Sequence, residues 1–274
     1  IDQQEKNGFY LNVNKAHDLL EELKTKSEDL KKYLQTIFPT IYTPRFHKTT
    51  GKPLKDHVDE FNPSSRKQIA ERLQKKYSWV PKKTTPTGLP VIDEKVLKEL
   101  IYPEAKMIAE YLLYEKRVSQ IQSWLKNVRD DNRVHGKVIT LGCVTSRMSH
   151  YGPNMAQVPA SYSPYGKECR SLWTIENPDK YCLVGSDASG LELRCFAHYL
   201  QNPKFTEQVV DGDIHTYNQN IIGLKDRPTA KTWVYAFIYG AGDAKLGQIV
   251  GGNTEAGLAS RKRFINKVKG MKTL

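Results

Sequence analysis

The chain has 274 residues, of which 39% are hydrophobic and 26% are charged. This length and composition indicate a globular chain of one large domain or two to three smaller ones. No run of 18 apolar residues occurs, which excludes a transmembrane helix and a membrane partner. The four cysteines form no C-x-x-C pair, which argues against a zinc site and a disulfide framework and fits a reducing cytoplasm.

The formal net charge is +12, and residues 31–83 contribute most of it, with 13 basic and 4 acidic residues. Such an excess attracts polyanions, of which nucleic acid is the usual one. A basic surface that is merely solvated is the alternative. The chain begins with Ile1 and lacks the regions of a signal peptide, so we expect an excerpt of a longer product, or a processed or engineered one.

The first half of the sequence predicts helices separated by loops. Apolar residues recur at helical spacing over 14–37, which indicates a long helix. Residues 39–63 hold four prolines and a glycine, so we expect a loop there. A second helix follows in "NPSSRKQIAERL", with Asn62 or Ser64 near its N-terminal cap, and a loop is expected over 80–90.

The second half adds short strands to the helices. The spacing over 93–128 predicts one long helix or two, and 134–160 is typical of short strands and turns, with "VHGKVIT" and "CVTSRMS" as candidate strands. A strand at 181–187, a helix at 190–200, a helix at 227–239 and basic helical segments to the C-terminus complete the series. We therefore expect an α+β chain that is mostly helical.

The stretch "SDASGLELR", residues 186–194, places one acid, Asp187, where the predicted strand ends and the next helix begins. A carboxylate that opens into a cleft at a strand end suits Mg²⁺, which takes few protein ligands and completes its shell with water and phosphate. Ser189 and Glu192 also fit the S-x-x-E capping pattern, so these two residues can simply start a helix. This alternative does not account for Asp187.

The stretch "RPTAKTWVYAFIYG", residues 227–240, predicts a helix with a proline at its start and Gly240 at its stop. Arg227, Lys231 and Tyr235 recur every four residues and share one face. Across roughly 12 Å, at about 1.5 Å per residue, that face offers two cations and then an aromatic ring, which suits a triphosphate and its base. In isolation, a solvated basic face with a half-buried tyrosine is the commoner interpretation.

Together with the DGDIHT segment at 211–216, these two stretches resemble the family A DNA polymerases, and most closely the replicative polymerases of thioredoxin-dependent podoviruses. "SDASGLELR" resembles motif A of that family, and "RPTAKTWVYAFIYGAG" resembles motif B. Further segments resemble the start of the polymerase region, the thumb and the connection to motif A; they are 7–20, 61–74, 145–159 and 163–173.

The resemblance implies a partial right-hand polymerase fold, made of a thumb, part of a palm and part of the fingers. Its implied divisions are a palm and thumb base helix over 1–37, a thumb over 38–135, a palm segment with motif A over 136–200 and a fingers segment with motif B over 201–274. The implied function is template-directed nucleotidyl transfer in phage DNA replication, and the implied location is the cytoplasm of a bacterial host.

The resemblance also assigns roles to residues, with two Mg²⁺ ions as cofactors, dNTP as substrate and primer–template DNA as partner. Asp187 and the backbone carbonyl of Ala188 match the metal ligands, and Asp187 and Lys231 match the catalytic residues. The residues that match nucleotide-binding positions are Glu192, His215, Arg227, Lys231 and Tyr235. The residues that match DNA-binding positions are Arg147, Asn154, Gln157, Tyr239 and Gly240.

The sequence departs from the family at three points. The 3′–5′ exonuclease domain and the later palm hairpin with motif C are not matched, so we expect a truncated or split piece whose isolated chain polymerises poorly or not at all. The alternative function is a catalytically inactive primer–template-binding fragment that needs a second polypeptide carrying motif C. The thioredoxin-binding insertion is also unmatched, and residues 39–60 offer only a short basic loop, so we do not expect thioredoxin as a partner.

Overall fold

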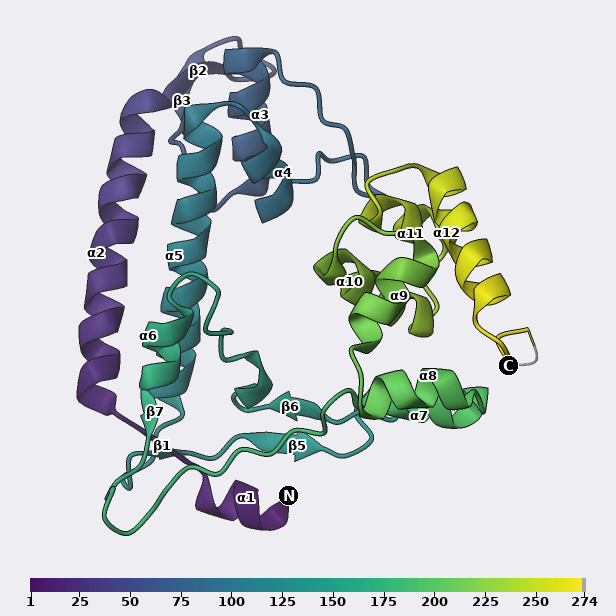
Figure 1. Cartoon of the computed structure of the whole chain (residues 1–274). Coiled ribbons are helices and arrows are strands. Elements are labelled where there is room, and N and C mark those ends of the chain that lie inside the picture. Colours follow the sequence, from purple (N-terminus) through teal and green to yellow (C-terminus); the bar gives the residue numbers. More distant parts are fainter. Residues whose placement is uncertain (273–274) are drawn as a thin grey trace. The chain divides into compact units, whose positions relative to one another are not determined.

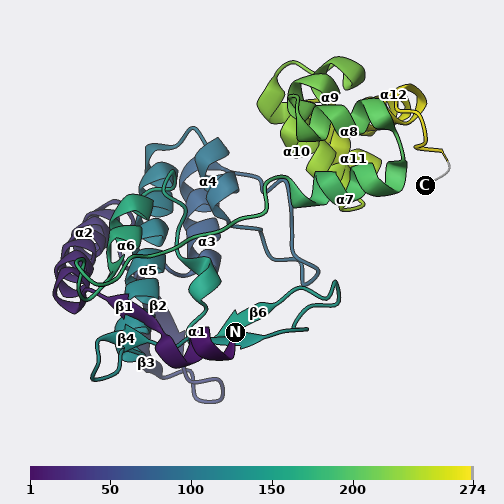
Figure 2. The same cartoon turned by 60° about the horizontal axis from the view of Figure 1, so that its bottom comes forward.

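The computed structural model describes residues 1–272, and the chain divides into two compact units, unit 1 (Ile1–Leu183) and unit 2 (Val184–Leu274). Figures 1 and 2 show the elements of each unit from two directions. Helices dominate and the strands are short, which confirms the expected α+β, mostly helical class. Within the described residues, none of the helices combines the length and the apolar character that spanning a bilayer requires.

Unit 1 is built on two long helices that pack side by side, α2 (Val13–Ile37) and α5 (Pro103–Lys126) (Figure 1). The side chain of Asn12 begins α2, because its oxygen accepts a hydrogen bond from the backbone N–H of Lys15 at 3.0 Å. The shorter helical elements of unit 1 are α1 (Asp2–Asn7), α3 (Arg66–Tyr77), α4 (Glu94–Glu99), η1 (Met155–Gln157) and α6 (Gly166–Ser171).

The helices predicted over 14–37 and 93–128 are confirmed, the second as the separate helices α4 and α5. Pro103 explains the break, because proline suits the first turn of a helix and ends the preceding one. The cap of α3 is neither Asn62 nor Ser64 but Ser65, whose hydroxyl accepts from the backbone N–H of Gln68.

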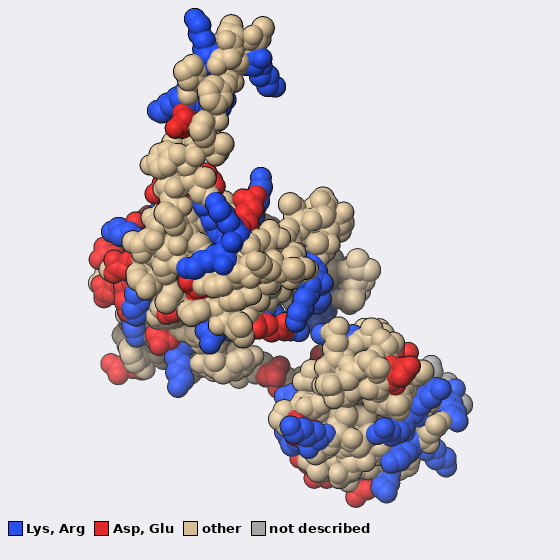
Figure 3. Space-filling model, turned by 90° about the horizontal axis from the view of Figure 1, so that it is seen from above, with Lys and Arg blue, Asp and Glu red and all other residues tan. Residues whose placement is uncertain are grey.

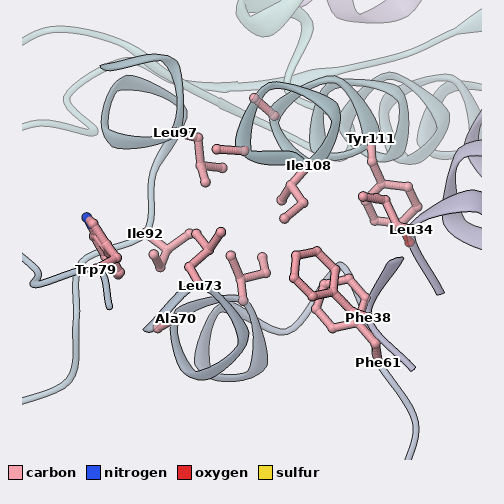
Figure 4. Close-up of a cluster of buried hydrophobic side chains, with 13 residues drawn as sticks. Leu34, Phe38, Phe61, Ala70, Leu73, Trp79, Ile92, Leu97, Ile108 and Tyr111 are labelled. Atoms are coloured by element: carbon pink, nitrogen blue, oxygen red, sulfur yellow. The ribbon is translucent and has the colours of Figure 1, made fainter. Parts of the chain in front are cut away.

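Two hydrophobic cores hold unit 1 together. The first lies among the C-terminal end of α2, α3, α4 and α5. Figure 4 shows Ile108 pointing towards the neighbouring rings of Phe38 and Phe61, whose centroids are 4.7 Å apart. The second lies where the remainder of α2 and α5 meet the short strands, and it includes the fully buried Leu11.

Three small antiparallel sheets complete unit 1. Strand β1 (Phe9–Leu11) pairs with both β4 (Arg133–Val134) and β7 (Trp173–Thr174), and β5 (Lys137–Ile139) pairs with β6 (Ser149–Tyr151). The strand expected at "CVTSRMS", residues 143–149, is not formed, except that its last residue, Ser149, begins β6. Ser146 donates its backbone N–H to the carbonyl of Cys143 and has a φ of 59°, so this segment turns instead of extending.

The loop expected over 39–63 is also wrong, because residues 41–59 form a β-hairpin of β2 (Ile41–Phe46) and β3 (Pro53–Asp59). The prolines suggested a loop because they cannot donate to a strand ladder. Here Pro44 lies at the register shift between Thr43 and Arg45, and Pro53 is the first residue of its strand, where the missing N–H is tolerated.

Unit 2 is helical throughout its described residues. Its helices are α7 (Leu191–Leu200), α8 (Pro203–Val210), α9 (Ile214–Ile222), α10 (Arg227–Ile238), α11 (Asp243–Ile249) and α12 (Thr254–Lys267). They surround a core in which the fully buried Trp233 stacks on Phe237 and meets Phe264 edge to face. Helices α11 and α12 approach closely at Gly257, where a Cβ would lie 1.9 Å from the carbonyl oxygen of Asp243.

The strand predicted over 181–187 is not formed. This run has no regular secondary structure and its apolar side chains are exposed, with Val184 86% accessible. An isolated extended segment has no ladder hydrogen bonds to hold it, so apolar composition alone does not make a strand. None of the strands in residues 1–272 pairs with it.

Candidate functional site

A pocket of about 520 Å³ on unit 2 contains the two stretches that the sequence singled out. Its wall is made by the segment 187–192 and by Lys231 and Tyr235 of α10. The pocket therefore brings Asp187 and Glu192 together with two residues of the predicted helical face, Lys231 and Tyr235. The two acids and the two helical residues come from separate parts of the sequence.

Gly190, and not Ser189, forms the start of α7. Gly190 adopts a left-handed conformation with φ of 60°, and no side chain caps the helix, so the expected capping box is wrong. Glycine suits this position because it lacks the Cβ that penalises positive φ. The carbonyl of Ser189 instead accepts a hydrogen bond from Nε of Arg194 at 2.9 Å. The turn leaves residues 187–190 lining the pocket.

The local sequence explains the orientation of α10. Asp226 caps the helix by accepting from the backbone N–H of Thr229 at 2.8 Å, and a proline occupies its first turn. Ala230, Trp233 and Val234 are fully buried and share the face of α10 that packs against the core, so Lys231 and Tyr235 lie on the other side of the helix. Lys231 is consequently exposed and Tyr235 half-buried, as the spacing predicts.

Glu192 is held in place by Tyr239, whose hydroxyl donates to its Oε1 at 2.6 Å. This hydrogen bond joins the first turn of α7 to the C-terminal end of α10. Burial raises the pKa of the Tyr235 hydroxyl, and the nearby charge of Glu192 raises it further. Tyr235 is therefore a neutral ring on the wall of the pocket.

Arg227 is engaged with Asp213, which caps α9. Nε of Arg227 donates to Oδ2 at 2.8 Å, and Nη2 donates to Oδ1 at 3.1 Å. Hydrogen bonds from Arg227 and then from the Thr216 hydroxyl hold the pKa of the Asp213 carboxyl well below its usual range. Sequence reasoning missed Asp213. Its position before a helical run indicates a cap, but nothing local predicts the ion pair.

His215 follows Asp213 and lies beside Tyr235, with a ring-centroid distance of 6.1 Å. Its Nδ1 atom is buried and has no hydrogen-bond partner among the described residues. Burial lowers the pKa of His215, and the positive charges of Arg227 and Lys231 lower it further. The imidazole is thus neutral near pH 7. It lies on α9, close enough to Arg227 and Lys231 of α10 to be affected by their charges.

The donor set fits part of a magnesium site. Asp187 and Ala188 line the pocket. A carboxylate and a backbone carbonyl are hard oxygen donors that suit Mg²⁺, which usually keeps several waters and binds phosphate. Within residues 1–272, no group of three or more His, Cys, Asp or Glu side chains is placed to hold a metal ion. Asp187 and Ala188 therefore fit an ion held mainly by water and phosphate.

A second groove, of about 480 Å³, lies in unit 1 and brings together two of the predicted DNA-binding residues, Asn154 and Gln157. Asn154 begins η1, since its Oδ1 accepts from the backbone N–H of Ala156 at 3.1 Å. Gln120 of α5 fixes the segment by donating to the carbonyl of Gln157 at 3.1 Å. Lys116 adds a positive charge to the lining.

The other three predicted DNA-binding residues lie elsewhere. Arg147 lies in the segment between β5 and β6 and is not part of the groove lining. Tyr239 and Gly240 end α10 in unit 2, where Gly240 has a φ of 78° and open space around its Cα.

Known proteins match this chain over nearly its full length. The sequence profile of DNA polymerase family A matches residues 13–274. The DNA-directed DNA polymerases of Enterobacteria phage T3 and Escherichia phage T7 are each 34% identical to it over 342 aligned positions, which cover 99% of this chain and 48% of the relative. The chain thus spans about half the length of these relatives.

A solved structure shares the fold. It is the POL domain of Pol1 from M. smegmatis in complex with DNA primer-template and dNTP. The TM-score is 0.78 at 17% sequence identity, and the match covers 99% of this chain and 46% of the other. At this identity the similarity shows the polymerase-domain fold alone.

Proposed function

Because the chain belongs to DNA polymerase family A, we propose that it carries the nucleotide-binding and primer–template-binding parts of a DNA-directed DNA polymerase that replicates phage DNA in a bacterial host cytoplasm. The observation that carries this proposal is the convergence of Asp187, Lys231 and Tyr235 on one pocket of unit 2. A carboxylate can hold metal ions beside a nucleoside triphosphate, a cation can bind its phosphates, and an aromatic ring can stack on its base.

The cations of α10 bind the triphosphate. The side chain of Lys231 makes no ion pair within the described part of the chain, so its ammonium group is available to phosphate oxygens. Arg227 lies one turn earlier, and its exposed guanidinium can bridge Asp213 and a phosphate. Lys231 also neutralises the charge that develops on the leaving pyrophosphate, which is the catalytic role proposed for it. His215, kept neutral by its neighbours, adds a hydrogen-bond donor without a competing charge.

Asp187 and the carbonyl of Ala188 would hold magnesium beside these phosphates. When bound, the two metal ions activate the primer hydroxyl and stabilise the departing pyrophosphate. The role of this chain's own residues is to fix a carboxylate at the mouth of the pocket and to leave the remaining ligand positions to water and phosphate.

The other pocket residues select the nucleotide. Tyr235 offers a neutral, half-buried ring on which the incoming base and sugar can rest. Glu192 is held by Tyr239, so its carboxylate and the aliphatic part of its side chain form a fixed wall. A fixed wall beside the sugar disfavours a nucleotide that carries an additional 2′-hydroxyl.

The groove of unit 1 binds primer–template DNA. Asn154 and Gln157 offer amide groups that can donate to the hydrogen-bond acceptors common to all base pairs in the minor groove. Such contacts test pairing geometry without selecting a sequence. Arg147 in unit 1, and Tyr239 and Gly240 in unit 2, are the other residues proposed to contact DNA. Under this proposal residues 1–37 are the base helix, 38–135 the thumb, 136–200 the palm segment and 201–274 the fingers segment.

The second candidate function is a primer–template-binding fragment without catalysis of its own. The favouring observation is that Asp187 and Glu192 are the two carboxylates of the pocket, and Glu192 is engaged by Tyr239. A two-metal site in which one of the two carboxylates is already engaged lacks part of its cage, so this candidate needs further acidic ligands from outside the pocket.

Primer extension with Mg²⁺ and all four dNTPs, combined with a salt titration of primer–template binding, tests both candidates. We expect Asp187→Ala to abolish extension while Asp211→Ala, an exposed acid of the same unit, does not. Binding should weaken steeply with salt, because phosphate neutralisation releases counterions. Salt-sensitive binding without extension by the unaltered chain selects the second candidate, and salt-independent binding contradicts both.

A further inference from the structure

The β2–β3 hairpin presents an apolar face that nothing in the described chain covers. Tyr42 is 65% exposed and Phe46 is 62% exposed. They are four residues apart on β2, and the register shift between them places its extra residue on β3, so the alternation of β2 keeps both side chains on one face. Val58 pairs with Tyr42 and Pro53 with Phe46, which places two more apolar side chains on that face. A two-stranded hairpin with a solvated apolar face is typical of a binding element.

The same hairpin is basic. Residues 41–59 contain Arg45, Lys48, Lys52 and Lys55 and two acids, Asp56 and Asp59. Asp59 is neutralised at the base of the hairpin by Arg72 of α3, at 3.2 Å. None of the four basic side chains forms an ion pair within residues 1–272. Figure 3 shows Lys and Arg gathered towards the end of an arm that projects from unit 1.

The hairpin is anchored and its turn is ordered. Arg72 also donates to the backbone carbonyl of Asp59 at 2.9 Å, and Gln68 donates to its carboxylate at 2.7 Å. At the other end, the backbone N–H of His47 donates to the carbonyl of Lys52 at 2.8 Å, and Gly51 closes the turn with a φ of 66°. The backbone that carries the rings and cations is thus braced at both ends of the hairpin before any ligand binds, which reduces the entropy lost on binding.

We propose that this arm binds single-stranded nucleic acid, with Tyr42 and Phe46 as stacking platforms for bases and the four cations as contacts for the phosphates. Unpaired bases expose flat apolar faces beside a regular row of negative charge, and the arm offers the complement of both. A duplex supplies the phosphates but keeps its bases stacked. The inference goes beyond the proposed function, since none of the residues assigned to nucleotide or primer–template binding lies in the hairpin.

The test is fluorescence anisotropy with a 20-nucleotide oligo(dT) strand and a blunt duplex, without nucleotides. We expect Tyr42→Ala and Phe46→Ala each to weaken oligo(dT) binding by about tenfold and to change duplex binding much less. Tyr33→Ala, which removes an exposed ring of α2, is the matched control. Both arm residues are exposed, so these variants should keep the unfolding temperature of the parent chain.

The cations give a second, independent measurement. Replacing Arg45, Lys48, Lys52 and Lys55 by glutamine should flatten the dependence of log affinity on log salt for oligo(dT) by roughly 0.7 for each phosphate that is no longer neutralised. Lys24→Gln, on the exposed side of α2, should leave the slope unchanged. The inference would be overturned if the ring variants lost single-strand and duplex binding equally. It would also be overturned if they lost neither, and that result would point to a protein partner instead. Asp187→Ala should keep oligo(dT) binding, so failure of the catalytic proposal remains distinguishable.

Discussion

The guanidinium of Arg227 and the carboxylate of Asp213 meet in a two-point ion pair that ties the first residue of α10 to the cap of α9. The pair fixes the end of α10 that carries the phosphate-binding cations. It also lowers the pKa of Asp213 in the folded chain. A depressed carboxyl pKa contributes stability above its unfolded value, and that contribution is lost as pH falls towards the folded value.

Asp213→Asn should therefore make the free energy of unfolding depend less on pH in the acid range. The unaltered chain should lose stability as pH falls below about 4, the ordinary pKa of an aspartate, whereas the variant should lose less. The measurement is the urea midpoint of unfolding at pH 7 and at pH 3. Arg227→Gln removes the partner and should reduce the pH dependence in the same way. An equally steep loss in both variants would show that the ion pair does not contribute.

Lys231→Ala should weaken dNTP binding by about ten- to a hundredfold, because a charged hydrogen bond is worth about 1.5–3 kcal/mol. Lys245→Ala, an exposed lysine of α11, removes the same charge from unit 2 away from the pocket and should have little effect. Titration calorimetry with dNTP and Mg²⁺ measures both. Equal losses in the two variants would mean that only the overall charge of the unit matters.

His215 should be neutral at pH 7, and its pKa should rise when a triphosphate binds. Its pKa is lowered by burial and by the cations Arg227 and Lys231, and the negative phosphates would offset those cations. The nitrogen chemical shifts of the imidazole, followed by NMR between pH 4 and 8 with and without dNTP, measure the change. Lys231→Ala should raise the pKa in the free chain. A pKa unaffected by dNTP would place the phosphates elsewhere.

The helical half of this site could be predicted from the sequence. Four-residue spacing placed Lys231 and Tyr235 on one face of α10, where both line the pocket. The burial of Trp233 confirms that the opposite face packs against the core. The contacts of Arg227 with Asp213 and of Tyr239 with Glu192 could not be predicted, because they join residues 14 and 47 positions apart and depend on how the helices pack.

The strand errors have a related cause. Residues 181–185 are apolar but find no pairing partner among the described strands, whereas residues 41–59, which contain two prolines, pair with each other. Strand formation depends on a partner as much as on composition, since ladder hydrogen bonds hold a strand. Helices such as α2 carry their own hydrogen bonds, and this is why their limits were predictable from spacing alone.

Ser260→Ala should destabilise unit 2 by about 1–3 kcal/mol, the penalty of leaving a buried donor unpaired. The indole N–H of the fully buried Trp233 donates to the Ser260 hydroxyl at 3.0 Å. Trp233→Phe removes that donor, so adding Ser260→Ala to it should cost less than Ser260→Ala alone. Chemical denaturation of the two single variants and the double variant measures the coupling, and strict additivity would show that the hydrogen bond contributes nothing.

Glu192→Ala should narrow the preference for dNTP over the corresponding ribonucleotide, because it removes the fixed wall proposed beside the sugar. Tyr239→Phe should narrow it to a lesser degree, by about fivefold or less, since it deletes one hydrogen bond to the carboxylate and leaves the Glu192 side chain present. Comparing the dissociation constants of dATP and ATP measures the preference without requiring extension. Tyr199→Phe, an exposed tyrosine of α7, removes a hydroxyl away from the pocket and should leave the ratio unchanged. A preference that survives Glu192→Ala would move the sugar selection to another residue of the pocket.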